Sequence, residues 1–299
     1  MTVYAQAAQE LHTIRDWLRF AVSQFEKSDI FYGHGTDNSY DEAVWLIMSA
    51  LHLPMETLNN FLDARLTQSE RDKLAQLIEQ RITKHTPTAY LLKEAWLQGF
   101  KFYVDERVLI PRSFIAELLA SDLSPWVEFP EMIESAADIC TGSGCLGVLL
   151  ANSFPNAAID VVDISQDAID VCNINIANYG LENQITAIKS DMFSALAGKK
   201  YDIIISNPPY VDAPSMAALP AEYQNEPQLA LGSGTAGLDH THTLLREAAS
   251  YLNDDGLLIV EIGHNREALE AAYPNTIFNW LETSSGNEFV FLLTKEQLI

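Results

Sequence analysis

The segment Asn207-Pro208-Pro209-Tyr210 has residue types that could do chemistry on a planar amide. It directly follows the strand-like run YDIIIS, at the carboxyl end of a strand, where open α/β sheets bind their ligands. Two consecutive prolines lack N–H groups and continue neither a helix nor a strand ladder, so they hold the backbone rigid. A turn that only ended a strand would not call for asparagine before the prolines and tyrosine after them. We therefore interpret the four residues as a binding and catalytic corner.

An amide would need such a corner because its nitrogen is a poor nucleophile, with the lone pair delocalised into the carbonyl group. The Asn207 side-chain oxygen and the Pro208 carbonyl oxygen could accept the two amide hydrogens, and Tyr210 could stack on the amide plane. Holding the reacting atoms in line can supply about 7–11 kcal/mol of a barrier, so positioning could carry most of the catalysis. His240 and His242 lie two residues apart on an expected helix, hence on different faces, and we expect no metal site.

A second set of residues could hold a nucleotide-like molecule. Thr141-Gly142-Ser143-Gly144 lies between a strand-like run and a helix, and glycines there let a ligand approach the backbone and the free N–H groups of the helix. Such a turn alone is a weak signal, because it occurs in many nucleotide-binding folds. Asp163 ends the next strand-like run, 19 positions beyond the last glycine of the turn, where a carboxylate can accept both ribose hydroxyls. Asp191 could accept an adenine amino group, with Ile164 and Met192 on the ring faces.

Alternating strand-like and helix-like segments after about residue 135 must position these residues. The runs AADIC, AAIDVVD, ITAIKS, YDIIIS and GLLIVEIG alternate with helical patterns, including those at 165–179 and 239–252. This alternation predicts a mostly parallel sheet covered by helices on both faces. The runs TIFNWLE and EFVFLLT at the end of the chain add an expected antiparallel hairpin.

The first 85 residues predict a small helical domain. Apolar residues recur at three- and four-residue steps from 11 to 25, and a second helix is expected over 40–51. A third helix should start after Thr67, with Ser69 as its cap. We expect this domain to recognise the substrate.

Between the helical domain and the α/β domain at 112–299, residues 86–111 change to β-forming patterns. GFKFYV at 99–104 and RVLI at 107–110 predict a β-hairpin that links the two domains.

The stretch 211–237 shows no convincing periodicity, and loops of this length are usually functional or disordered. We hypothesise that it forms a lid facing the substrate.

The chain of 299 residues carries 18 basic and 41 acidic side chains, a net charge of −23. Nucleic-acid binding depends on Lys and Arg contacts to phosphates, so this charge argues against nucleic acid as the main partner. A basic protein partner would suit the surface better, although an excess of acid can equally serve solubility.

The three cysteines lack C-x-x-C spacing, and the start of the chain resembles neither a signal peptide nor a membrane anchor. We expect a cytoplasmic protein with no membrane segment.

Together these motifs resemble the class I methyltransferases, and residues 207–210 resemble the N-P-P-Y signature of amino-methyltransferases that act on adenine, cytosine and glutamine. More closely, the chain resembles the bacterial protein-glutamine methyltransferases. The similar segments are TAYL at 88–91, FYVDERVLIPR at 102–112, EP at 226–227 and AL at 230–231. The resemblance therefore covers most of residues 86–299. Ser113, where release-factor enzymes usually carry proline, and the run LPAEYQNEPQLAL favour the branch that modifies a large-subunit ribosomal protein.

This resemblance implies a Rossmann-like, seven-stranded, mostly parallel sheet with S-adenosyl-L-methionine as cofactor and N(5)-methylation of a glutamine amide as the reaction. Asn207, Pro208, Pro209 and Tyr210 would bind that amide, and Asn207 would also border the cofactor. Cys140 departs from a glycine found in relatives, which leaves its own cofactor contact open. The implied contacts with the methionyl part, the ribose and the adenine of the cofactor fall on Thr141, Gly142, Ser143, Gly144, Asp163, Ile164, Asp191 and Met192.

Other functions share parts of this pattern. Release factors are a second protein target, and an adenine methyltransferase acting on DNA or RNA shares N-P-P-Y but conflicts with the charge of −23. A non-catalytic acidic chaperone for a basic ribosomal protein explains the charge, but not Asp163, Asp191 and Asn207 in register. Arg112 could bind and steer the substrate, or could form an ordinary ion pair in so acidic a chain.

Overall fold

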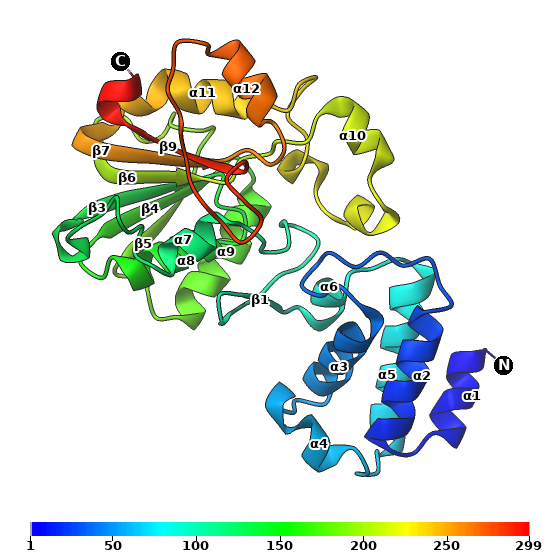
Figure 1. The fold of residues 1–299 in the computed structure, drawn as a ribbon. Helices are drawn as coiled ribbons and strands as arrows, with labels where there is room; N and C mark the ends of the chain where they lie inside the picture. Colours follow the sequence, from blue (N-terminus) through cyan, green and yellow to red (C-terminus); the bar gives the residue numbers. More distant parts are fainter. Residues whose placement is uncertain (1, 299) are drawn as a thin grey trace. The chain divides into compact units, whose positions relative to one another are not determined.

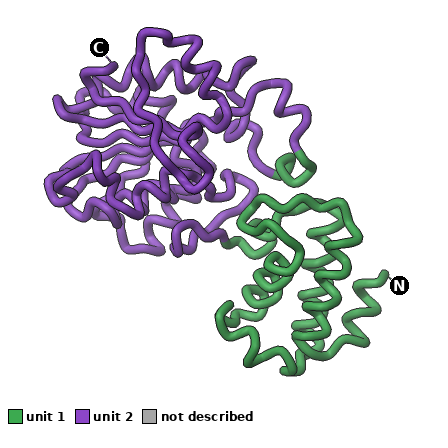
Figure 2. The backbone as a smooth tube through the Cα atoms, viewed as in Figure 1, with its two compact units in different colours: residues 1–94, 220–225 green, residues 95–219, 226–299 purple. Residues whose placement is uncertain are grey.

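The computed structural model describes residues 2–298, which form two compact units (Figure 2). The helical unit runs to Glu94 and also contains Pro220–Asn225; the sheet unit comprises Ala95–Leu219 and the chain from Glu226. The helical unit therefore extends past residue 85 and takes in a segment from far along the chain. None of the described helices is long and apolar enough to cross a membrane.

The helical unit packs its helices around one apolar core, which includes the fully buried side chains of Trp17, Leu46 and Ile78. These residues recur on one side of their helices, as the apolar spacing in the sequence predicts. The helices are α1 (Val3–Glu10), α2 (Ile14–Phe25), α3 (Ser39–Ala50), α4 (Leu58–Phe61), α5 (Gln68–Thr83) and α6 (Thr88–Leu92), with a short 3-10 helix at Met55–Thr57 (Figure 1).

Helices α2 and α5 both begin with a capping box. Thr13 and Asp16 form the box of α2. In α5 the Thr67 hydroxyl accepts the backbone amide of Glu70, whose carboxylate accepts the Thr67 amide at 2.7 Å. The prediction that Ser69 caps this helix is wrong, because only a residue three positions before Glu70 can complete the reciprocal pair.

A buried cluster of charges holds Pro220–Asn225 in the helical unit. Arg81 is 1% exposed and pairs with Glu42 and Glu222, with 2.9 Å from Arg81 Nη1 to Glu222 Oε1. Arg81 Nη2 also donates to the carbonyl oxygen of Phe31 at 2.8 Å. Burial alone would raise the pKa of Glu222, but hydrogen bonds from Arg81 and from the Phe31 amide outweigh it and lower the pKa.

The sheet unit contains seven strands in the order β5-β4-β3-β6-β7-β9-β8. Strands β3 to β7 run parallel, and β9 is antiparallel to both of its neighbours. This arrangement confirms the predicted mostly parallel Rossmann-like sheet with a closing antiparallel pair. The strands are β3 (Ser135–Ile139), β4 (Ala158–Asp163), β5 (Ile185–Lys189), β6 (Tyr201–Ser206), β7 (Leu252–Glu261), β8 (Asn279–Trp280) and β9 (Val290–Thr294).

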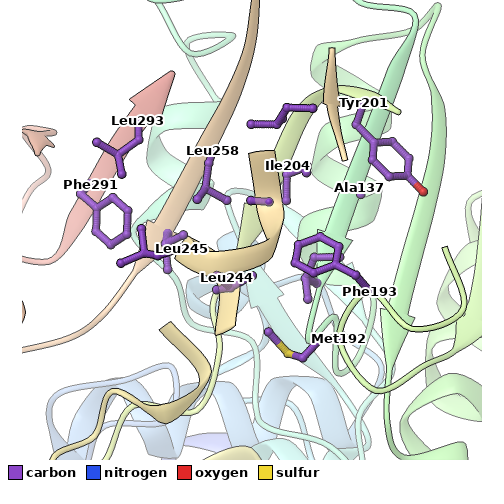
Figure 3. Close-up of a cluster of buried hydrophobic side chains, with 14 of the residues drawn as sticks. Ala137, Met192, Phe193, Tyr201, Ile204, Leu244, Leu245, Leu258, Phe291 and Leu293 are labelled. Carbon is purple, nitrogen blue, oxygen red and sulfur yellow. The ribbon is translucent and has the colours of Figure 1, made fainter. Parts of the chain in front are cut away.

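Helices cover both faces of this sheet, as Figure 1 shows. On one face, Leu244 and Leu245 pack with Ile204, Leu258 and Phe291 of the strands (Figure 3). Strands buried on both faces need nearly continuous apolar runs, which is why the runs in the sequence are so clear. The helices are α7 (Ile115–Leu119), α8 (Cys145–Ser153), α9 (Gln166–Asn178), α10 (Ala213–Ala218), α11 (Asp239–Glu247) and α12 (Arg266–Ala272), with 3-10 helices at Pro130–Met132, Gln228–Ala230, Ala248–Ser250 and Lys295–Leu298. The 3-10 helix at Ala221–Asn225 belongs to the helical unit.

The sheet unit begins with a hairpin of β1 (Ala95–Leu97) and β2 (Phe100–Phe102). The predicted pairing of GFKFYV with RVLI is therefore wrong. Gln98-Gly99 forms the turn, with φ of 49° and 78°, the positive values that two-residue hairpin loops favour. Downstream, the Asp105 carboxylate accepts the backbone amide of Arg107 at 3.1 Å, which makes a local turn where the second strand was expected.

Two side chains at the end of α9 fix β2 and the residue that follows it. The Tyr179 hydroxyl accepts from the Lys101 amide and donates to the Lys101 carbonyl, both at 2.9 Å. One turn earlier, Asn175 bonds the amide and carbonyl of Tyr103 at 2.7 and 3.0 Å, and also donates to the Ser143 carbonyl at 2.8 Å. The fully buried Asn175 thereby ties this segment to the glycine turn.

The direction of the chain across the sheet changes at β3. It continues to β4 and β5 on one side, and returns to β6 and β7 on the other. Ile139, the last residue of β3, pairs with Ser206, the last residue of β6, and the Ser206 hydroxyl donates to the Ile139 carbonyl at 2.6 Å. The residues that follow these two strands therefore start side by side, at the position where open α/β sheets bind ligands.

Candidate active site

An open cavity lies at these strand ends in the sheet unit. Its wall brings together most of the residues that the sequence singled out. These are Arg112, Thr141, Gly142, Ser143, Asp163, Ile164, Asp191, Met192, Asn207 and Pro209. Three further described residues, Gly144, Pro208 and Tyr210, do not line this cavity.

The glycine turn owes its shape to backbone conformations that suit glycine. Gly142 has φ of 55°, and a Cβ atom added to it would meet no atom within 4 Å, so its surface is open to a ligand. Gly144 precedes α8 with φ of 81°, and a Cβ atom there would lie 2.5 Å from the Cys172 sulfur. Cys140 has a positive φ of 64°, a conformation that costs a non-glycine residue about 1–2 kcal/mol. Glycine would adopt this conformation without that cost.

Asp163 joins the glycine turn to the end of β4. Its two carboxylate oxygens accept the backbone amides of Gly142 at 3.0 Å and Ser165 at 2.9 Å. Burial raises the pKa of this carboxyl, although these amide hydrogen bonds oppose the shift. A carboxylate offers about four acceptor positions, so Asp163 can also accept from a hydroxyl group of a ligand.

Other residues of the cavity wall combine apolar and acidic side chains. Ile164 is 48% exposed, and Met192 has a positive φ of 47° and places its sulfur 3.8 Å from the Cys140 sulfur. Asp191 is exposed on the same wall. Apolar faces beside a polar edge are the lining expected of a pocket for an aromatic ring that carries an amino group.

Asn207 has a defined side-chain orientation. Its Nδ2 donates to the carbonyl oxygen of Arg112 at 3.1 Å. A carbonyl oxygen only accepts, so the nitrogen end of the carboxamide faces Arg112 and the oxygen end points elsewhere. Among the described residues, no donor bonds to Asn207 Oδ1. This oxygen can accept a hydrogen from a ligand.

Tyr210 is held on several sides by the segment that follows β7. Its hydroxyl lies 3.5 Å from Glu261 Oε1, and its carbonyl oxygen accepts from Asn265 Nδ2 at 2.8 Å. Gly263 lies against the ring, because an added Cβ atom would come within 2.6 Å of it. A Cβ atom at Gly237 would lie 2.4 Å from the Tyr210 carbonyl oxygen. The corner is therefore fixed at Tyr210 as well as at Asn207.

Arg112 lines the cavity while its guanidinium forms an ion pair. Nη1 and Nη2 lie 2.8 and 2.7 Å from the two carboxylate oxygens of Glu226. The sequence suggested either substrate binding or an ion pair for Arg112, and the structure contains the ion pair. Its partner stands in the EP pair that the family resemblance had already marked.

Two buried acids near the site escaped sequence reasoning. Asp138 lies under the glycine turn, where burial raises its pKa to about 7 against a hydrogen bond from the Thr141 hydroxyl. Glu261 accepts from the Ser113 hydroxyl and the Phe114 amide, and burial raises its pKa to about 7. Both stand within strand-like apolar runs, and this placement is the only sequence signal that could have found them.

The stretch 211–237 is more ordered than its lack of periodicity suggested. It contains α10 and two 3-10 helices, because prolines and glycines divide it into short elements. Pro227, Leu229 and Ala230 from this stretch line the cavity, together with His240 of α11. Its role as a lid stays a hypothesis.

Comparisons with known proteins show which family this chain resembles. A model of the methyltransferase small domain matches residues 116–220. A ribosomal protein uL3 glutamine methyltransferase of Neisseria gonorrhoeae is 57% identical over 297 residues, 99% of this chain and 99% of that protein. One from Bordetella pertussis is 50% identical over 290 residues, 97% of each chain. The solved catalytic domain of hMettl16 in complex with MAT2A 3′UTR hairpin 1 matches over 79% of this chain and 83% of that chain, with a TM-score of 0.50. The two sequences are 14% identical, so the match shows a shared fold alone.

Proposed function

We propose that this chain, which belongs to the family of ribosomal protein uL3 glutamine methyltransferases, methylates the side-chain amide nitrogen of a glutamine in uL3. One observation carries the proposal. The pairing of Ile139 with Ser206 puts the glycine turn and Asn207, which follow these strand ends, on the wall of one cavity. A methyl donor and an amide could therefore meet there.

The residues of the sheet unit fit S-adenosyl-L-methionine as cofactor, which would supply a methyl group carried on a positively charged sulfur. The open backbone at Gly142, between Thr141 and Ser143, suits the methionyl part. The remaining acceptor capacity of the Asp163 carboxylate suits the ribose hydroxyls. The adenine ring would lie between Ile164 and Met192.

At the edge of that ring, the exposed Asp191 would accept hydrogen bonds from the amino group. The net charge of −23 suits a cationic sulfur, in addition to a basic protein partner. Within the cavity, the carboxylates of Asp163 and Asp191 supply negative charge locally.

The Asn-Pro-Pro-Tyr corner would hold and activate the glutamine amide. Asn207 Oδ1 and the Pro208 carbonyl oxygen would each accept one amide hydrogen, while Pro209 and Tyr210 would cover the amide and exclude water. As the amide nitrogen forms its bond to the methyl carbon, the bond from that carbon to sulfur would break and the sulfur would leave as a neutral thioether. The N–H groups would become more acidic during this step, and one of the two hydrogens would then be lost to solvent as a proton. Acceptors placed at these hydrogens bind more strongly in the transition state than in the ground state, which lowers the barrier.

Release factors are the second candidate substrate, because they too present a glutamine amide that the same corner could hold. Both full-length relatives described above carry the name of the uL3 enzyme, which favours the ribosomal protein. An acidic surface is suited to attract a basic ribosomal protein as it approaches. We propose a cytoplasmic reaction on that protein.

The proposed role of Asn207 can be tested with Asn207→Ala. We expect methyl transfer to uL3 to fall by about 100-fold or more, with the calorimetric cofactor affinity within about threefold of wild type. Asn156→Ala is a matched control, since Asn156 also donates its side-chain amide to a backbone carbonyl, Glu131 O at 3.0 Å, but outside the cavity. Full turnover in Asn207→Ala would refute the role given to this residue.

A further inference from the structure

We propose that Glu226 and Arg112 form a positioning pair that fixes which end of the Asn207 carboxamide faces the substrate. The inference rests on the proposed function, because it concerns the same amide. In this proposal Arg112 acts through its backbone carbonyl oxygen, which orients Asn207, and does not bind the substrate directly.

Glu226 is the centre of the arrangement. Its carboxylate side chain has no measurable exposure, and it accepts three hydrogen bonds, from Arg112 Nη1 at 2.8 Å, Arg112 Nη2 at 2.7 Å and the Ile110 amide at 3.0 Å. The two bonds from the guanidinium are parallel, and such bidentate pairs define geometry better than single contacts. Glu226 thereby fixes both the side chain of Arg112 and the backbone two residues before it.

A second carboxylate fixes the other end of the same short segment. Glu261 accepts from the Ser113 hydroxyl at 2.6 Å and the Phe114 amide at 2.9 Å. Pro111 adds a locked φ angle between the two anchors. The Arg112 carbonyl lies between these anchored points, so it has little freedom to turn.

This carbonyl is the atom that orients Asn207. It accepts Asn207 Nδ2–H at 3.1 Å. The two ends of a carboxamide have nearly the same shape, so packing alone discriminates poorly between an orientation and its 180° flip. A flipped Asn207 would turn its NH2 group toward the NH2 group of the substrate, donor against donor. The fixed carbonyl excludes that arrangement and leaves Oδ1 for the substrate.

The pair can be tested with Glu226→Gln, which keeps the shape of the side chain, and Arg112→Lys, which keeps its positive charge; each breaks the bidentate contact. We expect kcat for uL3 methylation to fall by about 10- to 100-fold, with KM for uL3 and the cofactor Kd within about threefold of wild type. If KM for uL3 rises while kcat is unchanged, Arg112 binds substrate directly and the proposal is wrong. Asp160→Asn is a matched control, because Asp160 is also a mostly buried carboxylate paired with a cation, Lys199 Nζ at 2.7 Å, away from the cavity.

A double-mutant cycle with Asn207→Ala identifies the route of the effect. If the pair acts through Asn207, adding Glu226→Gln to Asn207→Ala should cause less than about twofold further loss of kcat. Independent, multiplicative losses would overturn the proposal. The two failures remain distinguishable: the proposed function fails if Asn207→Ala retains turnover, whereas the pair fails if Asn207→Ala loses turnover and Glu226→Gln retains it.

Hydrogen exchange of the Asn207 side-chain amide tests the pair in variants whose turnover is too low to measure. In the labelled wild-type protein, the hydrogen of the Asn207 side-chain amide that faces Arg112 should exchange slowly with solvent, as detected by NMR. Glu226→Gln should increase its exchange rate by about tenfold or more, and Asp160→Asn should not. Equal exchange in wild type and Glu226→Gln would contradict the proposal.

Discussion

At the scale of single residues, the site depends on orientation more than on acid–base strength. Asn207 is directed by a backbone carbonyl, Tyr210 is held by the segment after β7, and the Asp163 carboxylate is shared between two backbone amides. Asn207 and Asp163 thus present only their remaining polar atoms to the cavity. Preorganised groups of this kind do not need to rearrange during the reaction.

Gly263→Ala should displace the Tyr210 ring and reduce kcat for uL3 methylation by about tenfold or more. The added methyl group would lie 2.6 Å from the ring, and the backbone has φ of 56°. Gly198→Ala is the control, because Gly198 has φ of 81° but no atom within 4 Å of an added Cβ atom. Steady-state kinetics of both variants separate the contact from the backbone strain. Equal kcat values would mean that the contact with Tyr210 has no catalytic importance.

Glu261→Gln should reduce the pH dependence of stability. The pKa of Glu261 in the folded protein is raised to about 7, mainly by burial, above the usual value of 4.5. Folding therefore favours its protonated form, and the stability associated with that form is lost as the pH rises from about 4.5 through 7, by about 3 kcal/mol. Denaturant unfolding across this range should give a flatter curve for Glu261→Gln. The exposed Glu282→Gln serves as the control. An unchanged slope in Glu261→Gln would contradict the assignment.

Sequence reasoning at this scale identified groups with a local signature. Glycines beside a strand end, acids at strand ends and the Asn-Pro-Pro-Tyr corner all have fixed spacing. Glu226 and Glu261 lack such a signature, because Arg112 lies 114 residues from Glu226 in the chain and Ser113 lies 148 residues from Glu261. Contacts of this range become visible only after folding.

At the scale of elements, the parallel strands were predictable because burial on both faces demands long apolar runs. The hairpin was misplaced, since β1 and β2 have only three residues each and their turn has no Asn-Gly or Asp-Gly signal. The insertion of Pro220–Asn225 into the helical unit was not predictable, because it depends on a buried ion pair between Arg81 and Glu222.

Arg81→Met should destabilise the helical unit by about 3–5 kcal/mol, because it leaves the buried carboxylates of Glu42 and Glu222 without their cation. Arg15→Met removes an ion pair with Asp63 whose side chains are 59% and 82% exposed, and should cost less than about 1 kcal/mol. Chemical denaturation followed by far-UV circular dichroism compares the two. A similar loss in both variants would argue against the buried cluster as the anchor.

Acid should release the same cluster. Because the pKa of Glu222 is lowered below 4.5 in the folded protein, its stabilising contribution is present above about pH 4.5 and is lost as the pH falls through the lowered value. Limited proteolysis between pH 3 and 5 should cut near residues 220–225 more rapidly at the acid end with an acid-tolerant protease. Cleavage that does not change with pH would contradict this assignment.

At the scale of the whole molecule, a net charge of −23 should steer a basic substrate protein. We expect kcat/KM for uL3 to fall by about tenfold between about 0.05 and 0.5 M salt, since exposed charges are screened over this range. A short neutral peptide that contains the same glutamine should show a much smaller change. Similar salt dependence for protein and peptide would assign the effect to the active site.

The most direct test of the central claim is to map the methyl group. The purified enzyme would be offered S-adenosyl-L-methionine with a labelled methyl group, together with uL3, a release factor or duplex DNA in parallel, and the products analysed by tandem mass spectrometry. We expect the label on the side-chain nitrogen of one glutamine in uL3, and its loss in Asn207→Ala. Label on DNA, on another residue type, or on uL3 equally in Asn207→Ala would contradict the account.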